Sequence, residues 1–228
     1  MTSPAQAHRD RVLAAKRGGD NPALDAKAAN LYEMMLMQLT EHRRALKTLQ
    51  SIDRKIQAKR QFLPQYAPYL EGVLTANTGQ QDEVLTTVML WDIDVGDIAA
   101  ALKLGSYAIE HDLTMPDRFE RGLPCTFAEE VADVAARLRD SDSAISSELI
   151  AQVISITKDS DMYDEVRAKL YRAYGEALEA EEQLQPAFDA YQTALKYNEK
   201  VGVKKLMEKL SRTLQNQQSD SGNNTPAD

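Results

Sequence analysis

Three carboxylates, Asp92, Asp94 and Asp97, lie within six residues. Carboxylate oxygens bind Mg²⁺ well, and two-metal nucleases use such ions to stabilise the attacking and leaving oxygens of a phosphodiester. The cluster is therefore a candidate metal site, with Asp94 and Asp97 as candidate catalytic residues. Helix capping is a simpler interpretation, with Asp94 as N-cap of a helix over 97–110 and Asp97 in its first turn. Without a second acidic cluster the catalytic residues stay unassigned, and we expect no cofactor unless Mg²⁺ serves a nuclease.

A second set of residues is positively charged. Residues 1–60 hold twelve Lys/Arg against six Asp/Glu, whereas residues 61–228 hold fifteen against twenty-nine. Between 43 and 60, opposed only by Asp53, lie Arg43, Arg44, Lys47, Arg54, Lys55, Lys59 and Arg60. Such a run can be a solvated helix face, but clustered Lys/Arg is also the electrostatic signature of nucleic-acid binding. The charge division favours the second interpretation, and we predict that these seven residues contact DNA phosphates.

Other classes of site have little support in the sequence. Cys125 is the only cysteine, and with three scattered histidines it offers neither a zinc-ligand spacing nor an intrachain disulfide. The phosphate-binding patterns G-x-x-x-x-G-K and G-x-G-x-x-G are missing, which argues against an ATPase. No apolar run approaches the roughly 20 residues that a membrane span needs, so we expect no membrane partner.

Helical signals recur along the chain and strand signals are nearly absent, which predicts an all-α fold. We expect a basic N-terminal arm over 1–20. Because neither glycine nor proline occurs between Pro22 and Pro64, we then expect one long basic helix over 21–63. Apolar residues spaced by three, four and seven along this helix are typical of a coiled coil, through which the chain would oligomerise. This apolar stripe comprises Leu31, Met35, Leu39, Leu46, Leu49, Ile52 and Ile56.

The pattern of residues 64–215 predicts an array of helix pairs. The segment 171–199 follows the 34-residue tetratricopeptide (TPR) pattern, with Gly175, Ala187 and Ala194 allowing two helices to approach closely. A weaker pair covers 85–112, and helices are expected near 127–139 and 147–157. We therefore predict a TPR-like α-solenoid body over 64–215. The polar segment 216–228 is expected to be a disordered tail.

Several short blocks of the sequence together resemble a known family. They are MTSPAQ at 1–6, LYEM at 31–34, DEVLTTVMLW at 82–91, DVGDI at 94–98, LTMP at 113–116, FAEEV at 127–131, DEVRAK at 164–169 and GVKK at 202–205. In this order the blocks resemble the small terminase subunit of cos-packaging, peduovirus-type temperate tailed phages. Many small terminases carry an N-terminal helix-turn-helix, whereas the sequence indicates no turn within 22–60.

The resemblance implies a part of the phage DNA-packaging motor that acts in the cytoplasm of the bacterial host. Such subunits bind double-stranded phage DNA at the cohesive-end site, form homo-oligomers that could close into rings, and deliver DNA to the large ATPase subunit. They are often called terminase endonuclease subunits, although these residues support DNA binding better than cleavage. Two alternatives remain open: a metal-dependent endonuclease that makes the cos cut itself, and a protein-only TPR-like adaptor.

Overall fold

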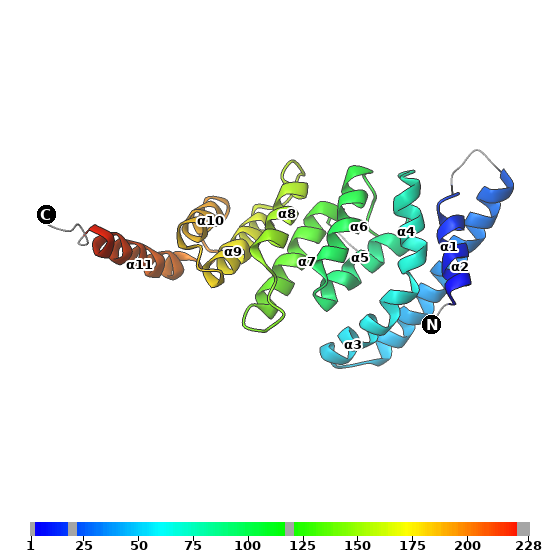
Figure 1. The fold of residues 1–228 in the computed structure, drawn as a ribbon, viewed down its shortest axis with the longest axis horizontal. Coiled ribbons are helices and arrows are strands. Elements are labelled where there is room, and N and C mark those ends of the chain that lie inside the picture. The colour runs from blue at the N-terminus through cyan, green and yellow to red at the C-terminus, as the bar shows by residue number, and fades with distance from the viewer. Residues whose placement is uncertain (1–2, 18–21, 117–120, 223–228) are drawn as a thin grey trace, which may run out of the picture. The chain divides into compact units, whose positions relative to one another are not determined.

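The computed structural model describes residues 3–17, 22–116 and 121–222, most of which are helical, with no strand among them (Figure 1). The helices are α1 (Pro4–Ala14), α2 (Pro22–Thr48), α3 (Ile52–Phe62), the 3-10 helix η1 (Leu63–Gln65), α4 (Ala67–Ala76), α5 (Glu83–Val95), α6 (Ile98–Glu110), α7 (Leu123–Leu138), α8 (Ser147–Thr157), α9 (Asp164–Ala180), α10 (Leu184–Tyr197) and α11 (Lys204–Gly222). This confirms the prediction of an all-α protein. The chain forms two compact units, Met1–Leu123 and Pro124–Asp228, called unit 1 and unit 2 below.

Unit 1 joins the N-terminal helices to the first part of the predicted body. Within the predicted arm, Pro4–Ala14 form α1, which packs against α2 and α4. A Cβ atom added at Gly72 of α4 would lie 2.7 Å from the Cβ of Ala14, so glycine allows the two helices to approach closely. Helices α5 and α6 form a hairpin, and both α2 and α3 contact α5. Unit 1 therefore spans the boundary that we predict between residues 63 and 64.

The single long helix predicted over 21–63 is wrong, because the chain breaks between Thr48 and Ile52. The hydroxyl of Ser51 caps α3 by accepting a hydrogen bond from the backbone N–H of Arg54 at 3.4 Å. The turn lets α3 fold back on α2, so that Phe62 stacks on His42 with ring centroids 3.8 Å apart. A good N-cap and tertiary packing thus end the helix without glycine or proline.

The apolar stripe of the two helices packs inside unit 1. Five of its seven residues are buried there: Leu31, Met35, Leu39, Leu46 and Ile56. Leu49 is partly buried, and Ile52 is 69% exposed. The five buried side chains contact their own chain and are not left for a second copy. The structure thus gives no support to a coiled coil along this stripe, which the break at 49–51 also interrupts.

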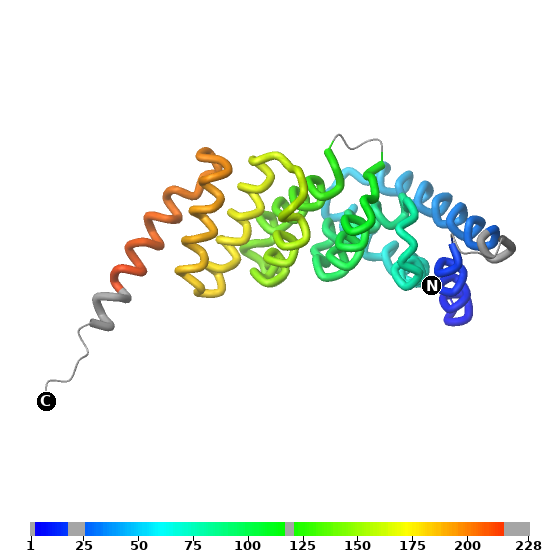
Figure 2. The backbone as a smooth tube through the Cα atoms, turned by 90° about the horizontal axis from the view of Figure 1, so that it is seen from above, coloured from blue at the N-terminus to red at the C-terminus, as the bar shows by residue number. Residues whose placement is uncertain are grey.

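Unit 2 contains the helix pair expected at 171–199, as α9 and α10, which lie side by side (Figure 1 and Figure 2). Ala187, Tyr191 and Ala194 are fully buried in its core. A Cβ atom at Gly175 would lie 2.5 Å from Cε1 of Tyr191, which explains the glycine at this helix crossing. The assignment of unit 2 to the TPR class stays a prediction.

Helix α11 continues to Gly222 and so enters the segment 216–228 that we predict to be disordered. Glutamine at 215, 217 and 218 is a good helix former, which accounts for the continuation. Residues 223–228 lie outside the described part of the chain.

Candidate nucleic-acid interface

An aromatic cluster holds the α2–α3 hairpin against α5. His42 shares a 2.7 Å hydrogen bond with the hydroxyl of Tyr66, and it stacks on Phe62. Trp91 of α5 lies against all three rings, with centroid distances of 6.1–6.5 Å. Burial lowers the pKa of His42, which favours the neutral ring in this apolar setting. The cluster therefore fixes the position of the basic helices in unit 1.

Ion pairs connect the cationic segment 1–60 to acidic residues further along unit 1. They join Arg11 to Glu71 at 2.5 Å, Arg17 to Asp82 at 2.8 Å, Arg43 to Glu83 at 2.6 Å, and Lys59 to Asp94. Over its whole length unit 1 has fifteen Lys/Arg against sixteen Asp/Glu. Much of the charge division in the sequence is thus neutralised within the chain.

Three of the seven predicted DNA-binding residues stabilise this packing. Arg43 also donates to Oγ1 of Thr87 at 2.6 Å, and Lys59 is only 14% exposed beside its carboxylate. Arg60 donates to the carbonyl oxygen of Val95 at 3.2 Å, at the C-terminal end of α5. Side chains committed in this way hold α2 and α3 in place, and they are less available to phosphates than free cations are.

The other four predicted residues surround the turn between α2 and α3. We call Arg44, Lys47, Arg54 and Lys55 the basic turn. Arg44 is 71% exposed and pairs with Glu41 at 2.6 Å, which is an exposed contact that water screens. Lys47, Arg54 and Lys55 form no ion pair with any carboxylate in the described part of the chain. Four of the seven predicted DNA-binding residues therefore lie around the turn between α2 and α3, and not along one continuous helix.

The three clustered aspartates take different structural roles. Asp97 caps α6 by accepting from the backbone N–H of Ala100 at 3.0 Å, while Asp94 pairs with Lys59. Asp92 is buried in unit 1. An aspartate does cap this helix as the capping interpretation expects, but the N-cap is Asp97 and not Asp94. The reason is that α5 ends only at Gly96, which has the left-handed conformation with φ of 86°. Within residues 3–17, 22–116 and 121–222 no group of three or more His, Cys, Asp or Glu could hold a metal ion.

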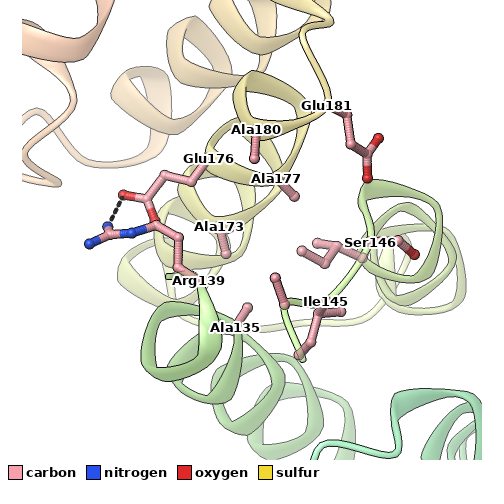
Figure 3. Close-up of a pocket in the computed structure, with 11 residues that line it drawn as sticks. Ala135, Arg139, Ile145, Ser146, Ala173, Glu176, Ala177, Ala180 and Glu181 are labelled. Carbon is pink, nitrogen blue, oxygen red and sulfur yellow. Dashed lines mark ion pairs between the residues drawn. The ribbon is translucent and has the colours of Figure 1, made fainter. Parts of the chain in front are cut away.

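Unit 2 contains a hollow that the sequence did not indicate (Figure 3). It measures about 200 Å³ between α7, α8 and α9, with walls of small residues that include Ala135, Ala173 and Ala177. At its edge Arg139 pairs with Glu176 at 3.3 Å. A second hollow of about 490 Å³ shares Arg139 and Glu176 and reaches Lys209 of α11. The small side chains of its walls leave the first hollow open beside this ion pair.

Membrane insertion has no candidate segment: none of the helices within the described ranges is both long and apolar enough to cross a bilayer.

Comparisons with known proteins identify the family. The family model described as phage small terminase subunit matches residues 36–165, which include the basic turn. The terminase endonuclease subunit of Escherichia phage P2 is 40% identical over 214 residues, covering 94% of this chain and 86% of the relative. The probable terminase endonuclease subunit of Haemophilus phage HP1 is 21% identical over 198 residues, covering 81% and 70%. No solved structure is significantly similar to the chain. The resemblance noted in the sequence is confirmed, and the chain belongs to the phage small terminase subunit family.

Proposed function

We propose that this chain binds double-stranded phage DNA near the cohesive-end site and delivers it to the large ATPase subunit in the cytoplasm of the bacterial host. The observation that carries the proposal is the basic turn. Most of the other Lys/Arg side chains of 1–60 whose contacts are described are paired with acids of unit 1, but Lys47, Arg54 and Lys55 remain exposed or partly exposed without a carboxylate partner in the described ranges.

The local geometry suits contact with phosphates. Arg54 and Lys55 lie in the first turn of α3, where the helix macrodipole adds partial positive charge. Two helices joined by the short turn 49–51 share the connectivity of a helix-turn-helix, whose second helix contacts DNA through its N-terminal residues. Several copies in a homo-oligomer would present several basic turns to one duplex. No turn was expected here from the sequence, and the candidate element becomes visible only in the break between α2 and α3.

Changing Lys47, Arg54 and Lys55 together to alanine should flatten the salt dependence of DNA binding. Each phosphate contact contributes about 0.9 to the slope of log K against log salt, so the slope should fall by roughly 2–3. The affinity at low salt should fall at least tenfold. Fluorescence anisotropy of a duplex that carries the cohesive-end site, titrated at several salt concentrations, measures both quantities.

The matched control removes three exposed lysines of unit 2, Lys196, Lys200 and Lys204, which changes the net charge equally. Its slope should stay near that of the unchanged protein. Equal losses in the two variants would mean that net charge, and not the basic turn, drives binding. Failure of the unchanged protein to bind duplex DNA at low salt would overturn the proposal and favour the adaptor.

We assign the large terminase subunit to the hollows of unit 2. The first hollow has walls of small residues, the second is lined by paired charges, and both features suit an inserted protein segment. Unit 2 has twelve Lys/Arg against nineteen Asp/Glu. Changing Ala177 to phenylalanine would fill the first hollow and should weaken binding of the large subunit of the same phage at least tenfold in a calorimetric titration. Ala136→Phe, at an exposed position of α7 outside the hollow, should leave binding unchanged. Equal affinities of both variants would refute this assignment.

Both relatives are named as endonuclease subunits, so DNA cleavage is the second candidate function. The described residues give it little support, because Asp94 is paired with Lys59 and Asp97 is a helix cap. We therefore propose that the large terminase subunit cleaves the DNA at the cohesive-end site. Nicking of cohesive-end DNA by this purified chain with Mg²⁺ would reverse that assignment.

A further inference from the structure

Asp92 differs from the other acids of its segment in having nothing to bind. Asp82 and Asp94 accept bonds from cations, and Asp97 caps a helix. The Asp92 residue is only 7% exposed, and its carboxylate has neither an ion pair nor a hydrogen bond within the described ranges of the chain. The carboxylate oxygens are not among the fully enclosed side-chain atoms without a partner in the described residues, so they reach the open space beside the residue. An unpaired carboxylate on a largely buried residue is still costly, so this group calls for an explanation.

The carboxylate borders a pocket of about 270 Å³ between η1, α4, α5 and α6. Asp92 and Val88 are four residues apart on α5 and so share the face that lines it. Most of the wall is apolar, and it includes Leu63, Leu70, Leu74, Val88 and Leu104. Two charged residues, Glu71 and the exposed Lys103, also border the pocket. Lys103 of α6 and Asp92 of α5, which both belong to the described residues, form no ion pair within 4.0 Å.

We propose that this pocket binds an alkyl cation, the side chain of an arginine or lysine supplied by a protein partner. The methylene stem of such a side chain matches apolar walls, and its charged head matches a buried carboxylate. The volume lies below the roughly 300–1,000 Å³ of typical small-molecule sites, so a single side chain fits better than a cofactor does. The proposal uses no residue of the basic turn and stands apart from DNA binding.

The electrostatics of the pocket agree with this ligand. Burial, and secondarily the charge of Asp97, raise the pKa of Asp92 to about 7. The other charged groups at the pocket are Glu71 from α4 and Lys103 from α6. An entering cation would therefore meet one further acid at the pocket, Glu71, which already pairs with Arg11, and the carboxylate of Asp92, which it can return to the ionised state.

Binding of n-butylguanidinium to the full-length protein at pH 8 tests the proposal directly. We expect saturable shifts of the backbone amide signals of α4, α5 and α6 in a nuclear magnetic resonance titration. Asp92→Asn should weaken this binding at least tenfold, and n-butanol, which has no charge, should not bind. The control Asp53→Asn removes an exposed carboxylate of α3 and should bind the probe as the unchanged protein does. Equal binding by the Asp92→Asn variant, or no binding by the unchanged protein, would overturn the proposal.

Two further variants separate the sources of the cation. If Lys103→Met binds the probe and the unchanged protein does not, Lys103 of the same chain fills the pocket and the proposal fails. If Asp92→Asn lowers the self-association measured by sedimentation velocity, the cation belongs to a second copy. If self-association is unchanged while probe binding is lost, a different protein supplies it.

Discussion

Replacing Asp82 with alanine should lower the free energy of unfolding of unit 1 by about 3–5 kcal/mol, because it breaks a buried ion pair and removes a helix cap. Asp82 is 0% exposed. Its carboxylate accepts hydrogen bonds from Nη1 of Arg17 at 2.8 Å, from the backbone N–H of Leu85 at 2.9 Å, and from the hydroxyl of Tyr69. Alanine would leave the Arg17 guanidinium largely buried without its counterion.

The same guanidinium connects three parts of unit 1. Arg17 donates to the carbonyl oxygen of Gln81 at 3.1 Å, and its Cζ atom lies 3.7 Å from the ring centroid of Tyr32 on α2. The N–H of Glu83 in turn donates to the Tyr32 hydroxyl at 3.3 Å. Loss of Asp82 should therefore loosen the end of α1 and α2 as well as the start of α5.

Trp91 is the only tryptophan of the chain and lies in the core of unit 1, so its fluorescence during urea unfolding reports on this unit. The control Asp97→Ala removes an exposed N-cap of the neighbouring helix and should cost only about 1 kcal/mol. Arg17→Met completes a double-mutant cycle, in which we expect a coupling of about 1–3 kcal/mol between positions 17 and 82. Losses of the same size in Asp82→Ala and Asp97→Ala would contradict the buried network.

Local signals in the sequence located most helices. Ser146 caps α8 by accepting from the N–H of Leu149, and the helix over 147–157 was predicted with the bounds that the structure shows. The close approach expected at Gly175 is present because the contact between α9 and α10 depends on residues of one hairpin. Short-range chemistry of this kind can be read from the order of residues.

The end of α2 was missed although a signal was present. Ser51 followed by Asp53 is a typical N-cap with an acid in the first turn, but no glycine or proline accompanies it. The apolar stripe posed a different difficulty. Its spacing indicates that one face is buried, yet the same spacing serves a second copy or the rest of the same chain. The contacts of α2 and α3 with α5 show that the stripe packs within the same chain, and these contacts depend on the tertiary fold.

The candidate site was only half visible for a similar reason. Seven cations stand out in the sequence, but the acids that neutralise Arg43 and Lys59 lie 40 and 35 residues away. Which cations stay unpaired depends on which helices meet, and neither composition nor local spacing contains that information. The pocket at Asp92 was hidden in the same way, since its lining comes from four separate elements.

Replacing Asp92 with asparagine should stabilise unit 1, and the gain should grow by about 2–3 kcal/mol between pH 5 and pH 8. The pKa of Asp92 is raised from 3.8 to about 7 in the folded protein. Below pH 4 the folded and unfolded chains both keep the proton, so the carboxyl costs nothing. Above pH 4 the unfolded chain releases the proton first, and the free energy of unfolding falls until the folded chain also ionises near pH 7. Asparagine cannot ionise and removes this dependence.

Urea unfolding followed by Trp91 fluorescence at pH 5 and pH 8 measures the difference, with Asp53→Asn as the control whose effect should not change with pH. An equal gain at both pH values would show that Asp92 already has a partner in solution. Saturating n-butylguanidinium at pH 8 should restore stability to the unchanged protein and not to Asp92→Asn, because a ligand stabilises only the folded state that binds it. In a cation-binding site, the ionised carboxylate should lower the free energy of unfolding when the site is empty and raise it when a cation is bound. Packing alone would not produce this dependence on the ligand.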